Sequence, residues 1–166
     1  MDKVVLLDRD GVINHDSPNY IKSPDEFHFI PGSLEAIQRL TQAGYKIGVA
    51  TNQSALSRGY FDLDTLNKIH QKMEMNIEIQ GGKIDCIEYC PHLPEQGCNC
   101  RKPKPGMLFK LADKMKFNLK DAYFVGDKPS DVEAALAAKV TPIYLNSISG
   151  DFSSLLDFVM NLILEK

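Results

Sequence analysis

The sequence lacks the features that direct a chain to a membrane or to nucleic acid. Its 166 residues contain no cluster of basic side chains and carry a formal net charge of −3. No apolar run approaches the roughly 18 residues that a membrane-spanning helix needs, and no basic segment followed by a long apolar stretch opens the chain. We therefore expect a cytoplasmic protein that binds neither nucleic acid nor a membrane.

Internal repeats, low-complexity segments and interdomain linkers are also absent. The composition, 43% hydrophobic and 25% charged, is typical of one soluble globular domain. A chain of this length buries about 70% of its unfolded surface, which suffices for a core without disulfides. We expect a single domain over residues 1–166 that acts as a monomer.

Apolar runs alternate with amphipathic segments along the whole chain. Short runs predict strands at residues 4–7, 45–50, 84–89, 122–125 and 140–145. The segments between these runs predict helices that begin near residues 33, 62, 108, 130 and 151. This alternation predicts a doubly wound, Rossmann-like α/β fold with a mostly parallel sheet.

Polar side chains follow three of the predicted strands directly: Asp8, Thr51 and Asp127. Because the carboxyl ends of parallel strands form one rim, we expect these groups to converge. Asp10 projects to the same side as Asp8 if the backbone stays extended. Carboxylates held this close need a cation or a shared proton to offset their charge, and the cation predicts a Mg²⁺ site formed by Asp8, Asp10 and Asp127.

Such a site suits phosphoryl transfer, with Asp8 as the nucleophile and Asp10 as the acid and base. The contribution of Asp10 to the metal would come from its backbone carbonyl. A simpler alternative is that Asp8 and Asp10 are solvated turn residues before Gly11, and that Asp127 is an acid at the start of a helix.

A second cluster consists of Cys90, His92, Cys98 and Cys100. Three cysteines and one histidine in a short segment are a ligand set for a closed, tetrahedral structural Zn²⁺ site, here in a loop over residues 90–105. The alternative is that these cysteines are unrelated loop residues. Cys86, on a predicted strand, is expected to be a packed core residue.

Four segments together resemble the haloacid dehalogenase superfamily of phosphohydrolases. They are DRDGVIN (8–14), TNQS (51–54), CRKPKPGM (100–107) and GDKPSD (126–131). With the cysteine cluster they are similar, more narrowly, to the branch of heptose-bisphosphate phosphatases and histidinol-phosphate phosphatases. The matching segments span nearly the whole predicted domain, and no stretch between them is long enough for a separate cap domain.

The resemblance implies a role for each matching residue. Asp8 would be the nucleophile, Asp10 the acid and base, Thr51 a hydrogen-bond donor to the transferring phosphoryl group, and Lys102 the cation that neutralises its charge. Substrate contacts would come from Arg9, Asp16, Tyr20, Asn52, Gln53, Ser54, Arg101 and Lys128, with Arg101 on a second phosphate. Asp131 would either orient Lys128 or a metal-bound water, or be a helix-start acid.

The expected reaction is removal of the 7-phosphate from a phosphorylated sugar, a heptose 1,7-bisphosphate. Hydrolysis of histidinol phosphate is the alternative, because only five residues separate His92 from Cys98. A phosphorylatable receiver module also places Asp, Thr and Lys at strand ends, but it would not need Asp10 beside Asp8. A purely structural zinc module would leave the carboxylates at the strand ends unexplained.

Overall fold

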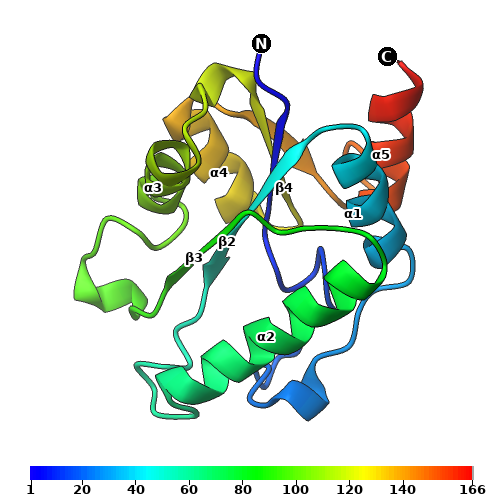
Figure 1. The fold of residues 1–166 in the computed structure, drawn as a ribbon. Helices are drawn as coiled ribbons and strands as arrows, with labels where there is room; N and C mark the ends of the chain where they lie inside the picture. The colour runs from blue at the N-terminus through cyan, green and yellow to red at the C-terminus, as the bar shows by residue number, and fades with distance from the viewer. Residues whose placement is uncertain (166) are drawn as a thin grey trace.

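The computed structural model describes residues 1–165, so Lys166, the last residue of the predicted domain, lies outside the described part. All five strands form one parallel sheet in the order β3-β2-β1-β4-β5 (Figure 1). The strands are β1 (Val4–Leu7), β2 (Lys46–Asn52), β3 (Cys86–Cys90), β4 (Ala122–Gly126) and β5 (Thr141–Tyr144). The doubly wound α/β fold expected from the sequence is confirmed.

Five α-helices cover the two faces of the sheet (Figure 1). The helices α1 (Ser33–Gln42), α2 (Leu63–Ile79) and α5 (Leu155–Leu164) pack on one face. The helices α3 (Gly106–Met115) and α4 (Pro129–Ala138) pack on the other. Short 3₁₀ helices lie at Pro24–Glu26, Pro94–Gln96 and Leu119–Asp121.

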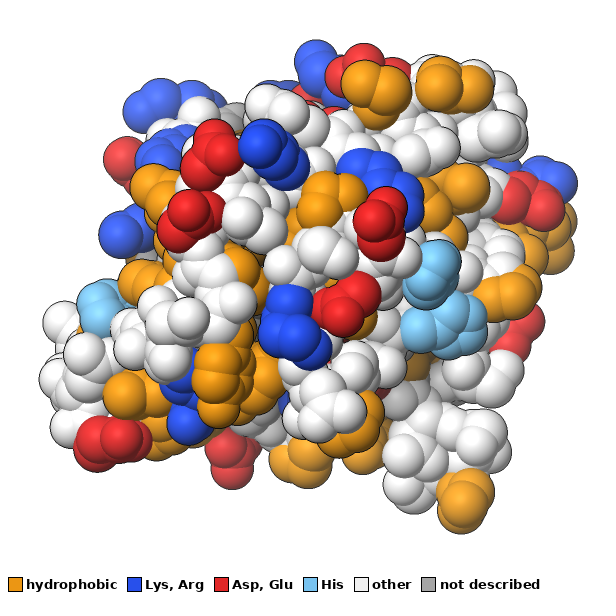
Figure 2. Space-filling view, turned by 90° about the horizontal axis from the view of Figure 1, so that it is seen from below, with side chains coloured by type: hydrophobic (Ala, Val, Ile, Leu, Met, Phe, Trp, Pro, Cys, Tyr) orange, Lys and Arg blue, Asp and Glu red, His pale blue; other side chains and the backbone are white. Residues whose placement is uncertain are grey.

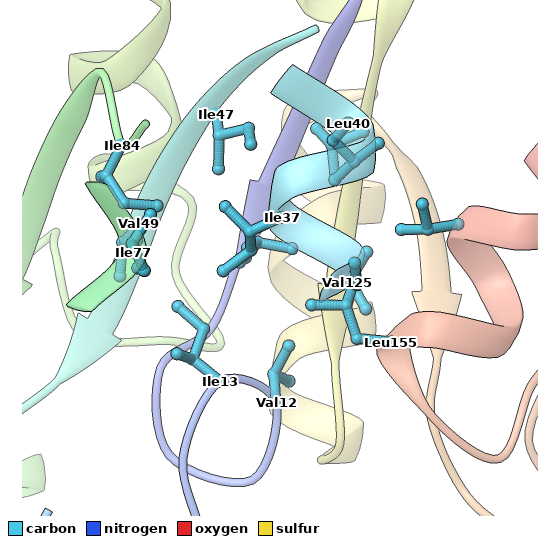
Figure 3. Close-up of a cluster of buried hydrophobic side chains, with 14 of the residues drawn as sticks. Val12, Ile13, Ile37, Leu40, Ile47, Val49, Ile77, Ile84, Val125 and Leu155 are labelled. Atoms are coloured by element: carbon cyan, nitrogen blue, oxygen red, sulfur yellow. The ribbon is translucent and has the colours of Figure 1, made fainter. Parts of the chain in front are cut away.

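The central strand β1 explains the two-sided core. Val5 and Leu7 face the cluster under α1, α2 and α5, whereas Val4 and Leu6 face the cluster under α3 and α4. All four side chains are buried, as expected for a strand covered on both faces. Figure 3 shows the first cluster, in which Ile37 of α1 lies among aliphatic side chains of the sheet and neighbouring segments.

Several element boundaries differ from the sequence prediction. Strand β2 continues through Thr51 and Asn52 instead of ending at residue 50, because both residues pair with β3. Helix α5 begins at Leu155 and not near Asp151, because the Ser154 side chain caps the helix and Asp151 instead accepts a hydrogen bond from the Tyr144 backbone. The strand of residues 84–89 also begins later, at Cys86.

The topology places a crevice at the ends of β1 and β4. From β1 the chain proceeds to β2 and β3 on one side, then crosses to β4 and β5 on the other. Parallel sheets bind ligands where the strand order reverses in this way. The backbone N–H of Asp8 donates to the Val125 carbonyl at 2.9 Å, which anchors the first acidic residue at this point.

Among the helices within residues 1–165, none combines the length and apolar character needed to cross a bilayer. The cytoplasmic location and the monomeric state expected from the sequence stay predictions.

Candidate active site

A cavity of about 560 Å³ opens at the carboxyl ends of the strands. Figure 2 looks onto this end of the molecule, where basic and acidic side chains lie next to each other near the middle of the face. Most of the predicted site residues line the cavity: Asp8, Asp10, Asp16, Tyr20, Thr51, Asn52, Ser54, Arg101, Lys102 and Lys128. The sheet therefore brings together residues that are far apart in the sequence.

The floor of the cavity is a buried ion network around Lys102. Its Nζ lies 3.0 Å from an Asp8 oxygen and 2.7 Å from an Asp131 oxygen, and it donates to the Ala50 carbonyl at 3.0 Å. Burial raises the pKa of Asp8, and the Lys102 charge offsets only part of that effect. Burial alone would lower the pKa of Lys102, but Asp8 and Asp131 hold it above its ordinary value.

Asp8 and Asp131 line the cavity and Asp127 lies beside them, so three carboxylates form a candidate magnesium site. Oxygen atoms of Asp8, Asp127 and Asp131 all lie within 4.8 Å of one another. Lys102 and Lys128 do not balance three such charges, since Lys128 also pairs with Asp16, and hard carboxylate oxygens are the donors that Mg²⁺ prefers. Two glycines make room for the cluster, because a Cβ on Gly11 would collide with Asp127 and a Cβ on Gly126 with Asp131. The donor set therefore fits a divalent cation.

Asp131 lies beside Asp8 and Asp127, a neighbour that the sequence did not predict, whereas the Asp10 side chain is not among the clustered carboxylates. The metal contact expected from the backbone carbonyl of Asp10 stays a prediction. The Asp10 carboxylate accepts hydrogen bonds from Arg9 Nε at 2.9 Å, Asn14 Nδ2 at 2.9 Å and Gln53 Nε2 at 3.1 Å. Burial would raise the pKa of Asp10, but the Arg9 charge and these hydrogen bonds hold it below its ordinary value. The Asp10 side chain is thus held at the cavity wall, apart from the three clustered carboxylates.

Arg9 and Gln53, expected to contact substrate, do not line the cavity. The Arg9 side chain has no exposed surface and forms an ion pair with Asp10 at 2.8 Å. Gln53 is also buried and donates to both Asp10 and Thr51. In this structure, both residues position other side chains.

Sequence analysis gave His70 no role, yet it lies against Arg9. Its Nε2 is 3.1 Å from Arg9 Nη1. Burial, followed by the Arg9 charge, lowers the pKa of His70 to about 3, so the ring is neutral. Arg9 has only donors, so Nε2 of His70 must be the acceptor. Helical spacing with Leu66 and Met73 marks His70 as buried, but no local pattern identifies a partner so distant in sequence.

Residues from the early loop and from α4 form one side of the cavity mouth. Lys128 Nζ lies 3.3 Å from Asp16 and 3.2 Å from Asp127, so it connects the loop to the acidic cluster. These acids, with Asp8, raise the pKa of Lys128 despite its partial burial. Tyr20, in the same loop, adopts a positive φ of 66°. The predicted loop residues thus lie at the rim of the cavity.

The second cluster brings its four predicted members together. The sulfur and ring nitrogen atoms of Cys90, His92, Cys98 and Cys100 all lie within 4.8 Å of one another. Burial raises the pKa of Cys90 to about 12, while backbone N–H groups overcome desolvation to lower the pKa of Cys98 to about 6. Four soft or borderline donors without an open position fit a structural Zn²⁺ ion.

The segment after this cluster carries Lys102 into the cavity floor. The Arg101 N–H donates to Cys98 Sγ at 3.4 Å, so the cluster is linked to the first basic residue. Asn52 and Lys102 exchange two hydrogen bonds, of 3.1 and 3.2 Å, between the Asn52 amide and the Lys102 backbone. This segment is thereby attached to the end of β2.

Known proteins resemble the chain over most of its length. The family description of haloacid dehalogenase-like hydrolases matches residues 19–139. A Pseudomonas putida protein named D-glycero-beta-D-manno-heptose-1,7-bisphosphate 7-phosphatase is 48% identical over 149 residues, which are 90% of this chain and 85% of the relative. A Bordetella bronchiseptica protein of that name is 48% identical over 148 residues, covering 89% of this chain and 83% of the relative.

A crystal structure of the D,D-heptose 1,7-bisphosphate phosphatase from B. bronchiseptica, complexed with magnesium and phosphate, has a TM-score of 0.93 to this chain. The two share 42% identity, and the match covers 99% of each chain. A second such enzyme, from Burkholderia thailandensis, has a TM-score of 0.71 and 33% identity, covering 98% of this chain and 99% of its own. The chain belongs to the haloacid dehalogenase-like hydrolase family.

Proposed function

We propose that this protein is a Mg²⁺-dependent phosphatase that removes the 7-phosphate of D-glycero-β-D-manno-heptose 1,7-bisphosphate. The observation that carries the proposal is the convergence of Asp8, Asp10, Thr51 and Lys102 on one cavity. The relatives that are 48% identical carry the name of this activity. The cavity volume of about 560 Å³ suits a small phosphorylated sugar.

In the first step, an Asp8 carboxylate oxygen attacks phosphorus and forms an aspartyl-phosphate, while the bond from phosphorus to the sugar oxygen breaks. Asp10 must hold a proton in the substrate complex, although Arg9 and its hydrogen bonds lower its pKa, and it donates that proton to the sugar oxygen, so the sugar leaves as an alcohol. In the second step, Asp10 takes a proton from water, and the water oxygen attacks the same phosphorus atom. Inorganic phosphate is released and Asp8 is regenerated.

Groups that surround Asp8 compensate the negative charge of the phosphoryl group. The buried Lys102 ammonium stabilises the charge on the phosphoryl oxygens, and the Thr51 hydroxyl donates a hydrogen bond to them. When bound by Asp8, Asp127 and Asp131, with the backbone carbonyl of Asp10 as a further ligand, Mg²⁺ supplies the positive charge that lets two anions approach. Asn52, Ser54 and Lys128 contact the substrate from the cavity wall.

We assign the thiol cluster a structural Zn²⁺ ion with no part in the chemistry. All four ligands come from the protein, so no coordination position is left for water or substrate. The ion holds residues 90–105 in place, so that Arg101 and Lys102 keep their positions at the cavity. Arg101 contacts the phosphate that is not hydrolysed, because a guanidinium suits bidentate binding of that group.

Hydrolysis of histidinol phosphate is the second candidate, favoured only by the short spacing between His92 and Cys98. Steady-state kinetics on both compounds tests the choice. We expect a kcat/KM for the heptose bisphosphate at least about 100-fold above that for histidinol phosphate. The opposite ranking would overturn the proposed function. A stable phosphorylated protein without turnover would instead indicate a receiver module.

A further inference from the structure

Arg58 lines the same cavity, and neither the mechanism nor the motif comparison gives it a role. We propose that Arg58 is a specificity-determining residue that binds the distal phosphate, the one that is not hydrolysed, together with Arg101. This inference rests on the proposed function, because it requires a substrate with two phosphoryl groups.

The turn after β2 holds Arg58 at the cavity mouth. The Arg58 N–H donates to the Ser54 carbonyl at 3.0 Å, and the Ser57 hydroxyl donates to the Pro91 carbonyl at 2.6 Å. Pro91 lies between two members of the thiol cluster, Cys90 and His92. The turn that carries Arg58 is therefore attached to the loop that carries Arg101, and both arginines line one cavity.

The contacts of Arg58 orient its guanidinium but leave the two terminal nitrogens without a hydrogen-bond partner within residues 1–165. It lies over the Tyr20 ring, 5.8 Å from the ring centroid, and its Nε is 3.4 Å from Ser54 Oγ. Stacking on one face leaves the guanidinium edge, with its two terminal nitrogens, open for hydrogen bonds in the plane. Such an edge matches two oxygens of a phosphate.

The other cations at the cavity are already paired. Lys102 lies against Asp8 and Asp131, and Lys128 lies against Asp16 and Asp127. By contrast, within residues 1–165 no carboxylate lies within 4.0 Å of the Arg58 guanidinium, nor of that of Arg101. Arg101 Nη1 donates to the His92 carbonyl at 3.2 Å, but neither arginine has a carboxylate partner within residues 1–165, so both are positioned for an anion beyond the reacting phosphate. They would repel the ammonium group of an amino-alcohol phosphate.

The test compares two substrates that differ only in the distal phosphate. Wild type, Arg58→Ala and Arg58→Lys are assayed on heptose 1,7-bisphosphate and on heptose 7-phosphate. We expect Arg58→Ala to lower kcat/KM for the bisphosphate by about 10- to 100-fold, with the monophosphate changed by less than about twofold. Arg58→Lys keeps the charge but loses the planar fork, so its loss should be intermediate.

A binding measurement separates the distal phosphate from the reacting one. Heptose 1-phosphate, the product, should bind Arg58→Ala about tenfold or more weakly than it binds wild type, whereas the inhibition constant of inorganic phosphate should stay the same. The matched control is Arg39→Ala, which removes an exposed arginine of α1 that pairs with Glu35. This control should behave as wild type in every assay.

The possible results distinguish a failure of the role proposed for Arg58 from a failure of the proposed phosphatase function. An equal loss on both substrates, or no loss on the bisphosphate, would overturn the role of Arg58 while leaving the proposed function intact. If the wild-type protein does not hydrolyse the bisphosphate at all, the proposed function fails and the inference fails with it.

Discussion

The two candidate metal clusters of this protein are built in opposite ways. Asp8, Asp127 and Asp131 come from the ends of β1 and β4 and the first turn of α4, so only the folded sheet brings them together. The four members of the thiol cluster all lie between residues 90 and 100. One cluster is a product of topology, and the other of local sequence.

This difference in construction accompanies a difference in proposed role. The acidic cluster lies beside the buried Lys102, where burial above all, and a neighbouring carboxylate in addition, raise the pKa of Asp8 and of Asp127. The thiol cluster offers four donor atoms and lies at the end of β3 and in the loop that follows it. We therefore expect changes to the acidic cluster to affect chemistry, and changes to the thiol cluster to affect stability and loop position.

The largest effect is expected for Asp8→Asn. The substitution keeps the size of the side chain but removes the nucleophile, so kcat should fall by roughly 10⁴-fold or more. Circular dichroism and the melting temperature should show a folded protein. Near-normal turnover by Asp8→Asn would refute the assignment of the nucleophile and break the contrast between the clusters.

Changes to the thiol cluster should have a smaller effect on rate and a larger one on stability. We expect about one zinc ion per wild-type chain by elemental analysis, and little in Cys100→Ser. Loss of a structural ion should lower Tm by about 5–10 °C, and kcat/KM by about tenfold as Arg101 and Lys102 lose their support. Protein purified without added metal that contained no zinc would contradict this prediction. Cys86→Ser is the matched control, since Cys86 lies outside the cluster.

The dependence of kcat/KM on pH tests whether the acidic cluster, unlike the thiol cluster, acts directly in the chemistry. Burial raises the pKa of Asp8, and the group must be ionised to attack, so kcat/KM should fall as pH decreases through that pKa. A bound cation favours the ionised form, so saturating Mg²⁺ should move this acidic limb about one pH unit or more lower. The measurement is kcat/KM against pH at two Mg²⁺ concentrations. An unchanged limb would show that no cation binds beside Asp8.

The smallest effect is expected at His70, which does not reach the cavity. His70→Leu removes the acceptor for Arg9 and loosens the ion pair that holds Asp10, so kcat should fall about three- to tenfold with little change in KM. His70→Gln can still accept a hydrogen bond and should restore most of the rate. Equal losses in the two variants would show that His70 serves packing alone.

Much of the fold and of the candidate site could be predicted because the signals are local. A fully buried strand such as β1 must be apolar on both faces, so Val4–Leu7 is a continuous apolar run. Asp8 and Asp127 could be predicted as neighbours because parallel strands end at one rim. The residues of the thiol cluster could be grouped because they lie within a single loop.

The remaining features depend on contacts between distant segments. Asp131 lies in the acidic cluster beside Asp8 and Asp127, whereas hydrogen bonds from Arg9, Asn14 and Gln53 hold the Asp10 side chain apart from it. The buried partnership of Arg9 with His70, and the place of Arg58 at the cavity, likewise depend on how α2 and the turn after β2 pack.

The sequence by itself determined the order of the strands and helices along the chain, the members of the thiol cluster and the polar groups at the carboxyl ends of three strands. These features could be predicted because each produces a pattern of apolar, polar or cysteine residues within one short segment of the chain. Only the tertiary structure decided which carboxylates lie close together, which side chains hold Asp10, and which arginines of the cavity lack a carboxylate partner within residues 1–165. Hydrogen bonds and ion pairs between distant segments have no local signature, because each partner is an ordinary polar residue until the fold brings it to the other.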